Sequence, residues 1–74
     1  MADQSLDCKG QSCPMPIVNI SRAIKKMTQG QVLEVEATDP AFKADLEAWC
    51  QKLGHKLESF TPGDVLRATI RKAA

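Results

Sequence analysis

The stretch Gly30–Gly54, GQVLEVEATDPAFKADLEAWCQKLG, decides the fold because it holds a strand and a helix between two glycines. In residues 31–37, apolar side chains alternate imperfectly with glutamates, which predicts a strand. Asp39 and Pro40 predict a helix start, since aspartate caps free N–H groups and proline fits the first helical position. The helix should end at Gly54. Its apolar residues recur every three or four positions and are Phe42, Leu46, Trp49, Cys50 and Leu53.

The segments on either side of this stretch complete the architecture. Upstream, residues 14–29 are predicted to form an amphipathic helix that stops at Gly30, and residues 5–8 a short strand. Downstream, strands over residues 56–60 and 65–70 are joined by turn residues at 61–64. This β-α-β-α-β-β order predicts an α/β (α+β) two-layer sandwich, a four-stranded mixed sheet with both helices packed on one face. The apolar face of the first helix comprises Ile17, Ile20, Ile24 and Met27.

Composition limits the possible classes of function. The 74 residues are 43% hydrophobic and carry a formal net charge of +1, which fits a single domain over residues 1–74. A chain this short buries about 60% of its unfolded surface, so a deep pocket for a large cofactor is not expected. The near-neutral charge and the few aromatic residues argue against direct nucleic-acid binding. Because no signal peptide or membrane-spanning run is evident, we expect a cytoplasmic monomer with no membrane partner.

The chemistry is concentrated at a cysteine where a loop becomes the first predicted helix. Three cysteines are an odd number, so at least one thiol is free. At a helix start, unpaired N–H groups and the helix dipole favour a thiolate, which predicts a lowered pKa and a nucleophilic role for Cys13. Pro14 and Pro16 stiffen the first turn, and Gly10 permits a sharp bend before it. The alternative is that Cys13 is only a cap or a small buried residue.

Two short motifs surround this cysteine. Asp7–Gly10 reads DCKG and Cys13–Pro16 reads CPMP. They resemble the TusA/SirA-like family of small sulfur-carrier proteins, in which an Asp-x-x-Gly element precedes a Cys-Pro-x-Pro motif. The resemblance covers nearly the whole chain, because it extends to Thr38–Pro40, Gly54-His55 and Ile70–Lys72. It implies the same two-layer fold and a Cys13 that accepts sulfane sulfur as a persulfide and passes it on, with no metal or organic cofactor.

The resemblance also implies protein partners. They are a sulfur-donor protein, such as a desulfurase or a rhodanese-like protein, and a sulfur-acceptor protein. Members devoted to tRNA thiolation often have an acidic residue between the two prolines, whereas this chain has Met15. Other relatives are associated with sulfur oxidation, molybdenum-cofactor or selenium-related roles. The destination of the sulfur therefore stays open.

The remaining candidate residues have structural explanations as well as functional ones. Cys8 is expected to end a strand as a small semi-buried residue, with an auxiliary redox role, such as a disulfide to Cys13, as the alternative. Cys50 lies on the apolar stripe and is expected to be buried and inert. His55 is expected to be partly exposed at a strand start and is left out of the catalytic set. These four residues loosely imitate a zinc-ligand set, but the core position of Cys50 argues against a metal site.

Basic residues accompany the candidate site. Arg22, Lys25 and Lys26 on the first helix, with Lys9 before it, form either a solvated face or a rim that docks acidic partner proteins. The predicted function is a sulfur carrier or sulfurtransferase that works through Cys13 in a cytoplasmic relay for sulfur oxidation, tRNA thiolation or cofactor biosynthesis. The alternative is a non-catalytic regulatory or protein-binding module with a redox-sensitive cysteine.

Overall fold

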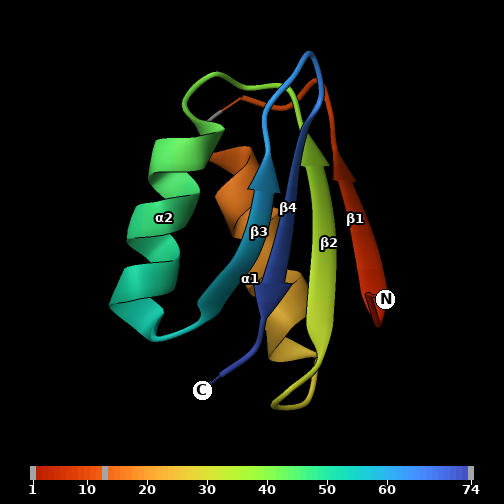
Figure 1. Cartoon of the computed structure of the whole chain (residues 1–74), viewed down its shortest axis with the longest axis vertical. Helices are drawn as coiled ribbons and strands as arrows, with labels where there is room; N and C mark the ends of the chain where they lie inside the picture. Colours follow the sequence, from red (N-terminus) through yellow and green to blue (C-terminus); the bar gives the residue numbers. More distant parts are fainter. Residues whose placement is uncertain (1, 13, 74) are drawn as a thin grey trace.

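The computed structural model describes residues 2–12 and 14–73 of the chain, so the predicted nucleophile Cys13 lies outside the described residues. Six elements follow the predicted order (Figure 1). They are strand β1 (Gln4–Cys8), helix α1 (Met15–Lys25), strand β2 (Val32–Ala37), helix α2 (Phe42–Leu53), strand β3 (Lys56–Thr61) and strand β4 (Leu66–Arg71). No helix among the described residues is long and apolar enough to span a membrane.

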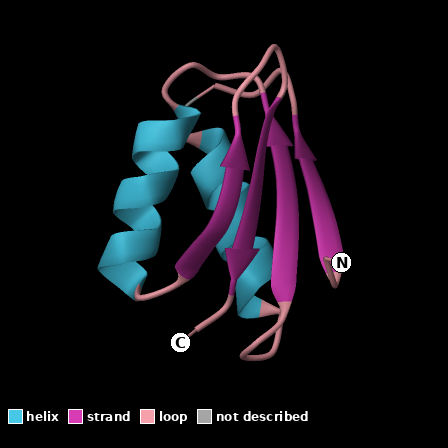
Figure 2. Cartoon of the chain, viewed as in Figure 1, coloured by secondary structure: helices cyan, strands magenta, loops and turns pink. Residues whose placement is uncertain are grey.

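The sheet is mixed, as predicted. Its strand order is β1-β2-β4-β3, with β1 parallel to β2 and β4 antiparallel to both of its neighbours. α1 provides the crossover that a parallel β1–β2 pair requires. Both helices cover the same face of the sheet (Figure 2). The opposite face carries charged side chains such as Glu34, Glu36 and Arg67. The predicted two-layer sandwich is confirmed.

The hydrophobic core lies between the helices and the sheet. Ile20 of α1, Leu46 of α2 and Leu33 of β2 are all fully buried in it, which confirms the apolar faces predicted from the spacing. One member of the predicted stripe is wrong, because Leu53 is 44% exposed. Leu53 is the last residue of α2, where the chain turns away toward β3 (Figure 1).

The start of α2 is later than predicted. The N-cap is Ala41, and the helix begins at Phe42 rather than at Asp39 and Pro40. Asp39 instead forms a turn before the helix, in which its Oδ1 accepts the N–H of Ala41 at 3.2 Å and its carbonyl accepts the N–H of Phe42 at 3.0 Å. Aspartate stabilises such turns as readily as it caps helices. The Asp39-Pro40 pair therefore predicted a helix in this part of the chain but not its first residue. Gly54 does end the helix in the left-handed conformation, with φ of 80°.

The end of α1 is earlier than predicted. The helix ends at Lys25 and is followed by a tight turn in which the N–H of Met27 donates to the carbonyl of Ile24 at 3.0 Å. Gly30 does not end the helix but lies in the next turn, with φ of 93°. A lysine from the other end of the chain binds carbonyls at this helix end: Lys72 Nζ donates to the carbonyl of Ile24 in the last turn at 2.9 Å and to that of Met27, just beyond the helix, at 2.8 Å.

Three loops lie together at one end of the molecule. They follow β1, β2 and β3, which point in the same direction, while both chain ends lie toward the opposite end (Figure 1). The loop after β1 carries the Cys13 region, and the loop after β2 carries Thr38. The topology therefore brings residues that are far apart in sequence to the candidate site.

Candidate functional site

The start of α1 is described on both sides of Cys13. Pro14 is the N-cap, Met15 is the first helical residue and Pro16 is the second. The N–H of Met15 donates to the carbonyl of Ser12 at 2.9 Å, and the N–H of Val18 donates to that of Pro14 at 3.1 Å. No acidic residue lies in the first turn, so the positive end of the helix dipole is not neutralised by a carboxylate there. The predicted placement of both prolines at the helix start is confirmed.

Hydrogen bonds from three other parts of the chain hold the loop before Cys13. Gly10 adopts φ of 81°, as its predicted bend requires, and its N–H donates to Oγ1 of Thr38 at 2.9 Å. The N–H of Gln11 donates to the carbonyl of Cys8 at 3.2 Å, and Asn19 Nδ2 donates to Gln11 Oε1 at 2.8 Å. Sequence reasoning missed these contacts of Thr38 and Asn19. The only signal for Thr38 was its place in the family resemblance.

Lys9, in the loop before Cys13, pairs with a carboxylate of β2. Its Nζ lies 3.8 Å from Glu36 Oε1, and Arg67 Nε lies 3.1 Å from Glu36 Oε2. The three residues form a small surface network between the site loop, β2 and β4. Such exposed pairs contribute little to stability, and the single carboxylate balances one of the two positive charges.

The two described cysteines are both buried. Cys8 is the last residue of β1 and is 0% exposed, more buried than the semi-buried position predicted. Burial, with a smaller contribution from the nearby Asp7 charge, raises the pKa of its thiol. Cys50 is 3% exposed, and burial raises its pKa to about 11, which confirms the predicted buried thiol. Both environments disfavour the thiolate, the nucleophilic form of cysteine.

His55 packs against an aromatic side chain and binds a backbone N–H near the end of the chain. Its ring lies 5.2 Å from that of Trp49, and its Nδ1 accepts the N–H of Ala73 at 3.3 Å. Burial and the charge of Lys72 lower its pKa, which favours the neutral imidazole. Across residues 2–12 and 14–73, no three His, Cys, Asp or Glu side chains gather in a way that could hold a metal ion.

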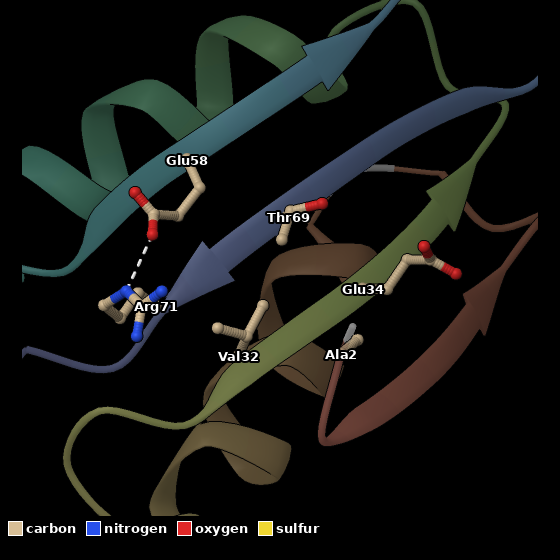
Figure 3. Close-up of a pocket in the computed structure, with 6 residues that line it drawn as sticks. All are labelled: Ala2, Val32, Glu34, Glu58, Thr69 and Arg71. Atoms are coloured by element: carbon tan, nitrogen blue, oxygen red, sulfur yellow. Dashed lines mark hydrogen bonds and ion pairs between the residues drawn. The ribbon is translucent and has the colours of Figure 1, made fainter.

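Two surface depressions differ in their relation to the site. One is a groove between α1 and α2, lined in part by Pro14, Ile17, Arg22, Lys25 and Trp49, and it includes the N-cap of α1. The other lies on the open face of the sheet (Figure 3). Its lining residues are Ala2, Val32, Glu34, Glu58, Thr69 and Arg71. Arg71 Nε there binds Glu58 at 2.7 Å, and Val32 opens β2 at the strand end remote from the site loop.

Comparisons with known proteins agree on one family. A family model described as "Sulfurtransferase TusA" matches residues 4–72. The chain is 47% identical over 72 residues to "Putative sulfur carrier protein YrkI" of Bacillus subtilis (strain 168), covering 96% of each sequence. It is 39% identical over 72 residues to "Sulfur carrier protein TusA" of Allochromatium vinosum, covering 96% of this chain and 95% of that protein.

A solved structure confirms the fold independently. The crystal structure of a SirA-like protein from Desulfitobacterium hafniense superimposes with a TM-score of 0.81, covering 96% of this chain and 99% of that one. The two sequences are only 22% identical, so this similarity supports the architecture alone.

Proposed function

The chain belongs to the TusA sulfurtransferase family, and we propose that it carries sulfur as a persulfide on Cys13 in a cytoplasmic relay. A donor protein, such as a desulfurase or a rhodanese-like protein, loads the thiol, and an acceptor protein removes the sulfur. Gly10, Pro14 and Pro16 set the position of the loaded residue. The relay serves sulfur oxidation, tRNA thiolation or cofactor biosynthesis.

The observation that carries this proposal is the contrast among the three cysteines. Cys8 and Cys50 are 0% and 3% exposed, and burial raises the pKa of both thiols. Neither can readily meet a protein partner. The neighbours of Cys13 on both sides, Ser12 and Pro14, are exposed. In a family of sulfur carriers, the sulfur chemistry therefore falls to Cys13.

The proposed reaction exchanges one sulfur–sulfur bond for another. The Cys13 thiolate attacks the terminal sulfur of a donor persulfide, so a new bond to Sγ forms while the donor's S–S bond breaks and the donor leaves as a thiolate. An acceptor thiolate then attacks the same terminal sulfur and releases Cys13 as a thiolate. Each step balances without an external oxidant or reductant. The unneutralised helix start favours the thiolate in both steps.

Loading with a small-molecule donor tests this proposal without requiring the right partner. The reduced protein is incubated with inorganic polysulfide, and its intact mass is measured before and after dithiothreitol. The wild type should gain sulfur that dithiothreitol removes, and Cys13→Ser should gain none. Cys8→Ala serves as the control and should load like the wild type; alanine avoids burying an unpaired hydroxyl at this site. Equal loading of Cys13→Ser, or no loading of the wild type, would exclude Cys13 as the carrier.

A further inference from the structure

We propose that the groove between α1 and α2 docks an acidic, partly apolar segment of the protein that exchanges sulfur with Cys13. This inference rests on the proposed function and adds to it the chemistry of the partner. The groove is defined by the apolar side chains of Pro14, Ile17, Val18 and Trp49, together with the basic Arg22 and Lys25.

The groove offers an apolar surface that the fold itself does not cover. Ile17 and Trp49 are only half-buried, although both pack against the core. Among the described residues, the large hydrophobic side chains left exposed are Met15 at 45% and Leu53 at 44%. Met15 follows Pro14, and Leu53 lines the continuation of the groove past Trp49. The half-buried Ile17 and Trp49 and the exposed Leu53 line the groove and its continuation, and an apolar surface of this kind on a small domain indicates a contact surface.

The charge along this strip has one sign. Arg22 and Lys25 line the groove, and its continuation includes Lys72 but no carboxylate from the described part of the chain. On the sheet, Arg67 pairs with Glu36 and Arg71 with Glu58. Neither Arg22 nor Lys25 forms an ion pair with any residue in 2–12 or 14–73. A partner that carries carboxylates supplies the missing charge.

The groove is continuous with the candidate site. Pro14 lines the groove and follows Cys13 directly in sequence, so a segment that lies in the groove reaches the start of α1. A nucleic acid would match the basic charge equally well. However, Trp49 is half-buried and packs on His55, which leaves no free series of aromatic rings on which bases could stack. The combination of an apolar floor and a basic rim favours a protein segment.

An NMR titration with a short synthetic peptide of alternating glutamate and leucine tests the proposal. The peptide should shift the amide signals of Val18 and Ser21 and the indole signal of Trp49. A peptide with lysine in place of glutamate should not. Lys25→Gln should weaken binding about threefold, as expected for the loss of one exposed ion pair. Lys26→Gln is the matched control, because Lys26 is also exposed and loses the same charge but does not line the groove.

Several outcomes would overturn the proposal. They are equal weakening by Lys25→Gln and Lys26→Gln, equal binding of the lysine peptide, or shifts that centre on Glu34 and Arg71 of the open sheet face. Tighter binding of a short oligonucleotide to the same residues would point to a nucleic acid instead. Concentration-dependent shifts without peptide would point to a second copy of the chain.

The test separates this inference from the proposed function. Cys13→Ser should bind the peptide like the wild type while failing to load sulfur from polysulfide. Normal loading with no peptide binding would remove the docking proposal alone. Peptide binding without loading of the wild type would remove the carrier proposal and leave a binding surface in place.

Discussion

The two ends of α1 are stabilised in opposite ways. At the C-terminal end, Lys72 Nζ donates to the carbonyls of Ile24 and Met27 at 2.9 and 2.8 Å. A positive charge thus meets the negative end of the helix dipole. At the N-terminal end, Pro14 is the N-cap and provides no capping side chain, and the first turn has no acidic residue. The negative dipole charge at the C-terminal end of α1 is therefore compensated by Lys72. The positive dipole charge at the N-terminal end is not compensated by an acidic side chain of the first turn.

The C-terminal end of α1 therefore contributes to the stability of the fold, whereas the N-terminal end is proposed to favour the reactive thiolate of Cys13. The start of α2 shows that the fold can supply acids to a helix start, because Asp45 lies in its first turn and Asp39 in the turn before it. The start of α1 lacks such acids where an anionic sulfur is proposed to form. A carboxylate there would stabilise the helix but repel a thiolate. The predictions below test the two ends separately.

The largest effect on the free energy of unfolding is expected at the C-terminal end of α1. Lys72→Met removes both hydrogen bonds to the carbonyls of Ile24 and Met27 while keeping an apolar stem of similar length. Hydrogen bonds from a charged donor contribute about 1.5–3 kcal/mol, so the free energy of unfolding should fall by about 2 kcal/mol in urea denaturation. Polysulfide loading of Cys13 in the folded variant should not change. Lys26→Met is the control, and a loss as large in that variant would contradict a specific role for Lys72.

A smaller effect on stability is expected in the loop that leads to the N-terminal end of α1. Thr38→Val removes the oxygen that accepts the N–H of Gly10 at 2.9 Å, and it should cost about 0.5–1 kcal/mol in stability. Because this hydrogen bond positions the loop before Cys13, the rate of iodoacetamide alkylation of Cys13 should also change. Thr38→Ser keeps the hydroxyl and should restore both values. If Thr38→Val lost stability but Cys13 were alkylated at the wild-type rate, Thr38 would have a structural role alone.

The smallest effect on stability is expected from an acidic residue at the N-terminal end of α1. Met15→Glu puts a carboxylate at the first helical position, which should raise the free energy of unfolding by about 0.5 kcal/mol. The same charge should raise the pKa of Cys13 and slow its alkylation near neutral pH about two- to threefold. The pH dependence of alkylation measures this shift, with Met15→Gln as the uncharged control. Faster alkylation of Met15→Glu would contradict a dipole-stabilised thiolate.

Much of the fold followed from spacing that is local in sequence. The three- and four-residue steps of Ile20, Ile24 and Leu46 predicted buried helix faces, and those side chains are at most 3% exposed. Gly54 predicted a left-handed helix end and adopts it. The same local reasoning predicted a buried Cys50 and placed Pro14 and Pro16 at the start of α1. It named Cys13 as the nucleophile, which stays a prediction.

Contacts between residues distant in sequence decided the rest. The order β1-β2-β4-β3 depends on pairing across the whole chain. Lys72 binds a carbonyl in the last turn of α1, and Thr38 binds Gly10, although neither partner lies nearby in sequence. The pairing of Lys9 with Glu36 and the exposure of Leu53 also depend on neighbours that no local pattern specifies. The sequence by itself determined which side chains are apolar or reactive and at what period they recur, because helix and strand geometry repeats locally. Only the tertiary structure decided which distant groups meet, because that depends on how the layers pack together.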